Sequence, residues 1–503
     1  MYAIKGKELR LDQFVKIARY KEEVCIAKEN VELIRQASDF VQGIVASERP
    51  VYGINTGFGK LANVAIKKAE VKKLQKNLLM SHACGVGDPF STEVVRGMML
   101  LRINALAKGY SGIRLGTLEK MVEFLNKDVT PIVYSQGSLG ASGDLAPLAH
   151  MSLPLIGLGE VEYLGKRLPA IEGLRQAGIA PLPDLEAKEG LSLINGTQAM
   201  TAVGAFVIYD ALNLEKTATL ALALTMEALE GIIDAFDPKI HALREHAGQQ
   251  LIAKRITTLL SNSRLITKDG QKRVQDAYSL RCAPQVHGAC LDALSHVCSV
   301  VEREMNAVTD NPVIFADTGE VISAGNFHGE PLALAFDYLA IAMSELANIS
   351  ERRIERLVNA QLSEGLPPFL VKTPGINSGF MIVQYSAAAL VSENKVLAHP
   401  ASVDSIPSSA NQEDHVSMGT IAARKARQVL DNATNVIAME LMTAAQAVAF
   451  RGVDKLADST RKAHELIRAE IPFIEEDVTM YPLIHKLAAS VHAGAYAGLI
   501  KGE

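Results

Sequence analysis

The sequence predicts a mainly helical protein with small β-hairpins and no large sheet. Long segments rich in alanine and leucine carry a continuous apolar stripe, which is typical of core helices. Helices of this length can bury their stripes only against one another, so we expect a long-helix bundle completed by neighbouring subunits. The segments cover about residues 201–235, 285–308, 329–360, 378–398 and 413–450.

The N-terminal part begins with a helical pattern over residues 8–47, which Glu48-Arg49-Pro50 interrupts. A glycine-rich loop follows at residues 52–59, and the sequence 137–143 forms a second loop of small residues. Between and after these loops we expect shorter helices. They cover about residues 67–81, 92–108, 114–126 and the segment that ends near residue 158.

Two short stretches have the pattern of β-hairpins. Residues 159–170 alternate around Gly165-Lys166, and residues 313–325 turn at Asp317-Thr318-Gly319. Prolines and glycines over residues 171–188 indicate a linker. We therefore predict two domains: residues 1–200, which carry the small-residue loop, and residues 201–503, which form the bundle and the core of an oligomer.

Composition and charge narrow the function classes. A formal net charge of -5 implies no basic surface, so nucleic acid is not an expected partner. The five scattered cysteines form no CxxC pair, which fits a reducing cytoplasm, and the charged N-terminus does not have the pattern of a signal peptide. Residues 191–209 lack charges but contain polar interruptions, so we expect a buried core helix and no membrane span.

Ala141-Ser142-Gly143 is the stretch with the most unusual chemistry open to it. Small side chains let one backbone amide approach another, and glycine is the least hindered residue. If the Gly143 nitrogen attacks the Ala141 carbonyl and water is lost, a five-membered ring closes. Loss of a second water from Ser142 leaves an exocyclic methylene, and the product, methylidene-imidazolone, is an electrophile. Taken alone, the tripeptide also fits an ordinary loop before a helix.

The longer sequence GSLGASGDLAPLAH resembles the signature of the aromatic amino-acid ammonia-lyases that carry this prosthetic group. The resemblance recurs between residues 52 and 418, and two of its blocks, SHACGVGD and SANQEDHVSM, are most similar to the histidine-specific members of the family. The further blocks are YGINTGFG, NGTQA, QDAYSLRC, TDNP and GNFHGEP.

This resemblance implies an enzyme that removes ammonia from L-histidine without oxidation, giving trans-urocanate in the first step of histidine degradation. The amine is a poor leaving group and the β-proton is weakly acidic, so the reaction needs an electrophile and a positioned base. The resemblance implies that methylidene-imidazolone formed from Ala141, Ser142 and Gly143 is that electrophile, with no external cofactor. It also implies a homotetramer whose subunits share active sites. No HExxH motif or Cys/His cluster supports a metal.

Tyr52, His82 and Asn195 match site residues of the family. Tyr52 matches the catalytic base, and its phenol must be hydrogen-bonded or near positive charge to act near neutral pH. His82 is implied to face the substrate's imidazole, and Asn195 can hold the substrate carboxylate or the ring oxygen. From the residues alone, Tyr52 could equally pack a turn, His82 could be a core histidine and Asn195 could be a helix N-cap.

Gln275, Tyr278 and Arg281 have spacings of three residues, so they could share one side of a helix that ends near Pro284. Arg281 is the best candidate for a bidentate clamp on the substrate carboxylate, although a solvated surface arginine is the ordinary alternative. The resemblance implies that Tyr278 and Gln275 support the prosthetic group. It also implies that Phe327 packs near the ring and that Glu413 belongs to the imidazole site.

Two other functions stay open. The first is a lyase or aminomutase that acts on tyrosine or phenylalanine. Tyrosine-selective relatives would carry histidine followed by an apolar residue where this chain has Ser81-His82, and phenylalanine-selective relatives would be apolar at both positions. The second is an inactive helical scaffold descended from the lyases, which would have lost Tyr52, Arg281 or the Ala-Ser-Gly sequence.

Overall fold

The computed structural model describes residues 1–47, 50–61 and 63–500, and it confirms the mainly helical prediction. The chain forms two compact units. Unit 1 contains residues 1–206, 298–337 and 400–424, and unit 2 contains residues 207–297, 338–399 and 425–503. Each compact unit is made of three separate stretches of the sequence. The division into domains after residue 200 stays a prediction.

Unit 1 is built around α4, whose side chains are buried from Val95 to Leu106. Within this helix Arg102 is fully buried, and burial lowers the pKa of its guanidinium to about 10. Its Nε donates to the carbonyl of Ser192 at 2.8 Å, and its Nη1 donates to the carbonyl of Thr309 at 2.8 Å. Arg102 therefore fixes the end of α8, next to the candidate site. The helices that lie wholly in unit 1 are α1 (Leu11–Ala18), α2 (Lys28–Ser47), α3 (Val71–His82), α4 (Thr92–Leu106), α5 (Leu115–Asn126), α6 (Leu145–Ser152), α7 (Ala170–Gln176) and α8 (Glu189–Ile194).

The strands of unit 1 are short and form four small sheets. Both predicted hairpins are confirmed: β6 pairs with β7 up to Tyr163 and Lys166, and β8 pairs with β9 up to Phe315 and Glu320. Beyond these hairpins, β1 pairs with β2 in parallel, β3 pairs with β5, and β4 extends the first hairpin. The strands are β1 (Tyr2–Ile4), β2 (Val24–Ile26), β3 (Val86–Pro89), β4 (Thr130–Pro131), β5 (Tyr134–Gln136), β6 (Glu160–Tyr163), β7 (Lys166–Pro169), β8 (Val313–Phe315) and β9 (Glu320–Ile322).

Three expectations about local structure are wrong. The pattern over residues 8–47 is two helices, because β2 separates α1 from α2 and pairs with the distant β1. The expected linker at residues 171–188 contains most of α7. The expected helix at 191–209 is buried but breaks after Ile194, where α8 ends and a short loop leads into α9. Glu48 and Arg49, expected to end the first helical pattern, lie outside the described residues.

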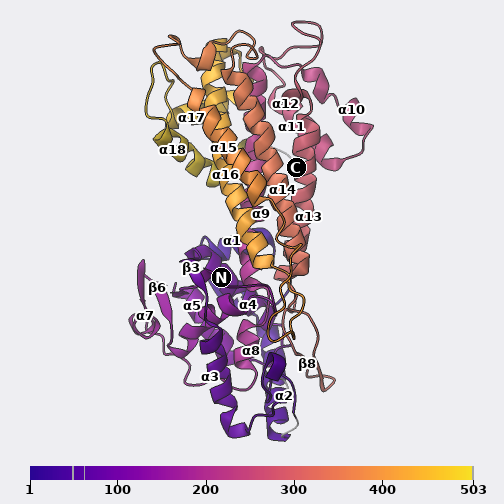
Figure 1. The fold of residues 1–503 in the computed structure, drawn as a ribbon, viewed down its shortest axis with the longest axis vertical. Helices are drawn as coiled ribbons and strands as arrows, with labels where there is room; N and C mark the ends of the chain where they lie inside the picture. The colour runs from indigo at the N-terminus through magenta and orange to yellow at the C-terminus, as the bar shows by residue number, and fades with distance from the viewer. Residues whose placement is uncertain (48–49, 62, 501–503) are drawn as a thin grey trace. The chain divides into compact units, whose positions relative to one another are not determined.

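Unit 2 is the predicted bundle of long helices. In Figure 1 the helices α9, α14, α15 and α16 run side by side within it. Four helices, α9, α13, α14 and α16, contribute residues to both units. The helices are α9 (Gln198–Ala228), α10 (Pro238–Ala242), α11 (Ala247–Leu259), α12 (Tyr278–Arg281), α13 (Ala283–Met305), α14 (Glu330–Val358), α15 (Met381–Leu397), α16 (Gly419–Arg451), α17 (Asp458–Glu470) and α18 (Tyr481–His492).

Two of these helices, α14 and α16, are long and apolar enough to cross a membrane by length and composition alone. Their most apolar windows are 67% and 83% buried inside the protein, which is typical of the core helices of a bundle.

A buried ion pair joins the helices of the bundle. The Glu440 carboxylate accepts two hydrogen bonds from Arg353, at 2.5 Å from Nε and 2.8 Å from Nη2. It also accepts the hydroxyls of Thr225 at 2.9 Å and Ser350 at 2.6 Å. Arg353 contacts His287 at 3.2 Å, and burial together with the Arg353 charge holds the pKa of His287 well below its ordinary value. Residues of α9, α13, α14 and α16 therefore meet in one hydrogen-bonded network.

Replacing Glu440 with glutamine should lower the free energy of unfolding by about 3–5 kcal/mol, because Arg353 would stay buried without its counter-charge. The matched control is Glu475→Gln, which breaks the exposed pair between Glu475 and Lys372 and should change the unfolding midpoint little. Urea unfolding followed by circular dichroism measures both variants. Equal midpoints for the two would contradict a structural role for the buried pair.

Candidate active site

The loop 140–143 has the tight backbone that small residues permit. Ser142 and Gly143 have φ angles of 53° and 77°, and the Gly143 N–H donates to the Gly140 carbonyl at 3.3 Å. A Cβ atom at Gly143 would overlap the carbonyl oxygen of Gly196. Only glycine at position 143 lets the loop pack against the segment between α8 and α9 in this way.

Asp144 anchors the loop from inside unit 1. Its N–H donates to the Gly196 carbonyl at 2.7 Å, and its buried carboxylate accepts the Ser138 hydroxyl at 3.0 Å and the Met200 N–H at 2.9 Å. The Thr420 hydroxyl donates to the same carboxylate. Burial raises the pKa of Asp144, and these hydrogen bonds oppose the rise. Three separate stretches of the chain, at residues 138, 196–200 and 420, thus hold the residue directly after Ala141-Ser142-Gly143.

Asn195 lies where α8 ends, so the N-cap alternative for this residue is wrong. Its side-chain N–H donates to the carbonyl oxygen of Ser142 at 3.0 Å. Its own Oδ1 is buried and has no hydrogen-bond partner among the described residues. The amide therefore offers a donor to the loop carbonyl and an open acceptor beside it.

A cavity of about 480 Å³ opens over this loop. It brings together five residues that the sequence predicted for the site, although they come from separate parts of the chain. The five are Tyr52, His82, Ser142, Asn195 and Glu413. Apolar side chains, including Phe58, Leu191 and Ile194, form much of the remaining wall. The cavity is mostly apolar with a few convergent polar groups, which is typical of a small-molecule site.

Glu413 reaches the small-residue loop from the segment before α16. Its Oε1 accepts the Ser142 hydroxyl at 3.0 Å, and its Oε2 accepts the Ser408 hydroxyl at 3.1 Å. The backbones of Ser408 and Glu413 also pair with each other. This turn points a carboxylate at the loop, and Ser408 is a supporting residue that no sequence motif indicated.

His82 is the last residue of α3 and is half-buried on the cavity wall. Its Nδ1 lies 3.0 Å from the Ser81 hydroxyl. Burial lowers the pKa of the ring, while the Leu78 carbonyl and the Glu413 charge oppose this change. A neutral imidazole at physiological pH can both donate and accept a hydrogen bond, so His82 suits recognition of another polar ring.

Tyr52 faces the same cavity, and its hydroxyl accepts the Gly59 N–H at 3.4 Å. Burial raises the pKa of the phenol, the Glu413 charge raises it further, and the Gly59 hydrogen bond opposes both. A phenol needs a hydrogen bond or a positive charge beside it to act as a base near neutral pH. Unit 1 supplies the hydrogen bond, whereas the charge that acts on Tyr52 is negative.

The remaining predicted site residues outside the loop are Phe327, Gln275, Tyr278 and Arg281. Phe327 follows β9 in unit 1, is half-buried and does not line the cavity. Gln275, Tyr278 and Arg281 belong to unit 2, and their relation to the cavity stays a prediction. Gln275 precedes the one-turn helix α12, so the three do not share one helical side as expected.

In unit 2, the Arg281 guanidinium lies 4.5 Å above the Tyr278 ring, and its Nε donates to the Asp276 carbonyl at 2.9 Å. The Tyr278 side chain is 70% exposed. The helix α12 ends at Arg281, close to Pro284 as expected, and Pro284 itself lies in the first turn of α13, where the missing N–H of proline costs nothing.

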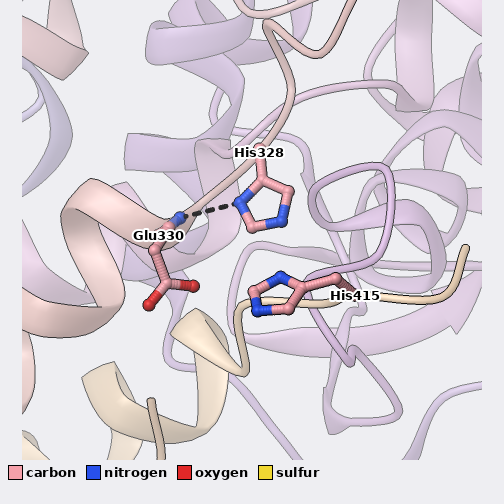
Figure 2. A group of neighbouring side chains, drawn as sticks. All are labelled: His328, Glu330 and His415. Carbon is pink, nitrogen blue, oxygen red and sulfur yellow. Dashed lines mark hydrogen bonds between the residues drawn. The ribbon is translucent and has the colours of Figure 1, made fainter. Parts of the chain in front are cut away.

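Within the described chain, one group of side chains has the composition of a metal site. His328, Glu330 and His415 place their ligand atoms within 4.8 Å of one another (Figure 2). The Nδ1 of His328 accepts the Glu330 backbone N–H at 3.3 Å, so the neutral ring carries its proton on Nε2. The imidazole rings of His328 and His415 are stacked, with their centroids 5.7 Å apart. Metal binding through Nε2 would require the other tautomer, so the geometry does not favour a metal here.

Comparisons with known proteins connect this geometry to a family. The model of the family described as aromatic amino acid lyase matches residues 9–469. Histidine ammonia-lyase of Symbiobacterium thermophilum is 58% identical over 496 residues, which cover 99% of this chain and 97% of that protein. Histidine ammonia-lyase of Alkaliphilus metalliredigens is 56% identical over 489 residues, which cover 97% of this chain and 96% of that protein.

Solved structures of ammonia-lyases and aminomutases are also similar to this chain. Histidine ammonia-lyase from Trypanosoma cruzi has a TM-score of 0.93 at 43% identity, covering 99% of this chain and 94% of its own. Tyrosine aminomutase from Streptomyces globisporus has a TM-score of 0.95 at 36% identity, covering 99% and 98%. The similarity extends over nearly the whole length of each protein and is not confined to one of the two units.

Proposed function

The chain belongs to the aromatic amino acid lyase family, and from this premise we propose that it eliminates ammonia from L-histidine to give trans-urocanate. The observation that carries the proposal is the identity of 55–58% with histidine ammonia-lyases over nearly the whole chain. The test is direct: the purified protein is incubated with L-histidine, and the ultraviolet absorbance of urocanate is followed. The proposal would be overturned if a folded protein, with the mass expected after loss of two waters from residues 141–143, gave no urocanate.

We propose further that Ala141, Ser142 and Gly143 form methylidene-imidazolone. The positive φ angles at Ser142 and Gly143, and the contact of Gly143 with Gly196, support a loop compact enough for ring closure. When formed, this group supplies an electrophilic carbon that makes the substrate amine a better leaving group. The carbonyl oxygen of Ser142 becomes the ring oxygen, and Asn195 already donates to it at 3.0 Å. Asn195 can thus stabilise negative charge that develops on this oxygen.

Tyr52 is the proposed base that removes the β-proton of the substrate. Its phenol lines the cavity that contains Ser142, so base and loop face the same volume. Arg281 is the proposed clamp for the substrate carboxylate, with Tyr278 and Gln275 supporting the prosthetic group and Phe327 packing near it. These assignments rest on the family resemblance, and their variants are to be tested for turnover separately from the variants of the cavity residues.

His82 and Glu413 are the proposed partners of the substrate imidazole. Ring nitrogens need polar partners once they are buried, and these two side chains line the cavity. A site built to hydrogen-bond its substrate rejects an analogue that cannot do so, often by about 10⁴–10⁵-fold, because its own buried groups are left unpaired. We therefore expect the protein to process histidine and to discriminate strongly against phenylalanine.

Two variants test this selectivity. Glu413→Gln keeps the shape of the side chain and removes its charge, so histidine turnover should fall, and His82→Leu should weaken histidine handling and relax the barrier to phenylalanine. Asp414→Asn is the matched control, because this neighbouring carboxylate is exposed and does not line the cavity. Values of kcat/KM for both amino acids measure the effect. Unchanged selectivity in both variants would rule out this imidazole pocket.

The runner-up is a lyase or aminomutase for tyrosine or phenylalanine. Solved structures of both kinds of aminomutase are similar to this chain at 36% and 34% identity. The same assays with tyrosine and phenylalanine distinguish these functions, and an inactive scaffold would turn over none of the three amino acids. Ser81-His82 favours histidine by the family pattern.

We also propose a cytoplasmic homotetramer whose subunits share active sites. Large side chains exposed on α15, namely Ile382, Tyr385 and Val396, support an interface with another copy. Exposure of Tyr278 supports a site completed by a neighbouring subunit. Light scattering should give four times the 54.1 kDa of the chain, and mixing a Tyr278→Phe variant with a Ser142→Ala variant should restore part of the activity.

A further inference from the structure

A buried ion pair in unit 1 joins two segments near the candidate site. The ammonium of Lys188 donates to the Asp310 carboxylate at 2.7 Å, and the two side chains are 0% and 1% exposed. The same ammonium donates to the Ser192 hydroxyl at 3.1 Å. Burial lowers the pKa of Lys188, and the Asp310 charge opposes this change. None of the three residues lines the cavity, so the pair can act on the site only through the segments that it joins.

One of these segments is α8, and the other is the sequence TDNP. Lys188 directly precedes α8, which forms part of the cavity wall. Asp310 lies in TDNP, and its Oδ1 accepts the Asn311 N–H at 2.8 Å. The Asn311 side chain in turn accepts the Ala324 N–H at 2.7 Å, which ties TDNP to the segment after β9. The ion pair thus connects the cavity wall to a segment that no step of the proposed reaction uses.

The backbone next to Tyr52 packs against both of the joined segments. Gly53 has a φ of 74°, and a Cβ atom there would lie 2.6 Å from Cδ2 of Leu191 and 3.0 Å from Cδ of Pro312. Leu191 belongs to α8, and Pro312 is the last residue of TDNP. We refer to the buried ion pair together with Leu191 and Pro312 as the clamp. The clamp holds Gly53 from two sides.

The backbone of Lys188 is strained at the point where it enters the clamp. Its φ is 66°, in the left-handed region that residues with a Cβ atom rarely adopt. Such strain persists only where the surroundings fix it, and it is found mainly at functional sites. A buried ion pair is also poor evidence for stability, because apolar residues of similar volume often stabilise a fold as well or better. Fixing the position of a neighbouring group accounts for both features.

We propose that Lys188 and Asp310 are positioning residues for the base Tyr52, an assignment that rests on the proposed function. By holding the clamp closed, the ion pair fixes the backbone next to Tyr52 and directs its phenol into the cavity that contains Ser142. Position matters for such a group, because a misplacement of about 1 Å can cost about 10²-fold in rate.

The test variant is Lys188→Met/Asp310→Asn, which removes both charges and leaves neither buried alone. Asparagine at position 310 keeps the oxygen that accepts the Asn311 N–H. We expect an unfolding midpoint close to that of the wild type and a kcat for histidine lower by about 10-fold or more, with little change in KM. The matched control, Glu215→Gln/Arg255→Met, removes a buried ion pair of unit 2 that also has an N···O distance of 2.7 Å, and its kcat should be unchanged.

Two further measurements separate positioning from a general loss of structure. In a Tyr52→Phe background, the same double substitution should lower kcat by less than about 2-fold, because the phenol that the clamp positions is already absent. Hydrogen exchange measured by mass spectrometry should be faster over residues 51–59 in the double variant, whereas peptides of unit 2 should exchange as in the wild type. The Ile54 N–H, which donates to the Val51 carbonyl at 3.1 Å, lies in that peptide.

Wild-type kcat, or wild-type exchange over residues 51–59, in the double variant would overturn the proposal. An equal loss of kcat with and without the Tyr52 hydroxyl would overturn it as well, because the ion pair would then act on the fold as a whole. The exchange measurement needs no substrate. If the wild type made no urocanate but the double variant exchanged faster over residues 51–59, the clamp would stand and the proposed function alone would fail.

A second variant decides the matter if the double variant does not fold. Gly53→Ala leaves the ion pair in place and inserts a methyl group between Leu191 and Pro312, so it should force the clamp open. We expect kcat to fall by about 10-fold or more, and the fall should again depend on the Tyr52 hydroxyl. Wild-type kcat in Gly53→Ala would overturn the proposal.

Discussion

Replacing Ser142 with alanine is expected to leave a folded protein whose turnover is reduced by about 10³-fold or more, as when a covalent catalytic group is removed. Alanine has no hydroxyl to lose as water, so the exocyclic methylene cannot form, and the electrophile accounts for most of the proposed catalysis. In the fold the change removes one hydrogen bond, from the Ser142 hydroxyl to Glu413 at 3.0 Å. Thermal unfolding should therefore change little while histidine turnover is lost.

Intact mass spectrometry gives the independent readout. The wild type should be lighter than its sequence mass by two waters, and Ser142→Ala should not show that loss. Ser408→Ala is the matched control, because it also removes one hydroxyl from Glu413 without touching the loop. It should keep the mass loss and most of the activity. Full sequence mass in a fully active wild type would overturn the proposed prosthetic group.

Tyr52→Phe is expected to reduce turnover by about 10²–10⁴-fold, the range found for general bases. The hydroxyl contributes a single hydrogen bond to the fold, from Gly59 at 3.4 Å, so folding and the loss of two waters should persist. Burial and the Glu413 charge raise the pKa of Tyr52 above its ordinary value of 10. The deprotonated form is therefore more populated as the pH rises, and the kcat/KM of the wild type should rise on the alkaline side.

That alkaline rise should be absent in Tyr52→Phe. The control is Tyr20→Phe, which changes an exposed tyrosine outside the cavity and should leave the profile unchanged. Near-normal turnover in Tyr52→Phe would mean that this tyrosine only packs the loop 52–59.

Sequence periodicity predicted the long helices and both hairpins because these patterns are local. It failed where pairing over a distance decides the structure. Residues 24–26 look like part of a helix until they pair with residues 2–4, and Gln275 looks helical until α12 is found to have a single turn. The close approach of Gly143 to Gly196 is likewise invisible in either segment alone.

In the candidate site, too, some residues could be predicted from local motifs and others could not. The Ala-Ser-Gly sequence and its flanking blocks pointed to Tyr52, His82 and Glu413, and the structure brings all three to one cavity. The direction of each pKa change depends on burial and on charges from distant segments, which no motif records. Ser408 and the buried contacts of Asp144 could be found only once the chain was folded.

The contact of Gly143 with Gly196 also bears on how the protein can change. A Cβ atom at Gly196 would overlap Gln198 and Arg102, so neither glycine accepts a side chain without rearrangement. The part of the site formed by Gly143 and Gly196 therefore depends on close backbone contacts, and almost no substitution is tolerated there. The other part, at His82 on the end of α3 and Glu413 on a loop, consists of side chains that can be exchanged at little structural cost. Directed evolution toward new aromatic substrates should accumulate its changes on the second part and leave the first untouched.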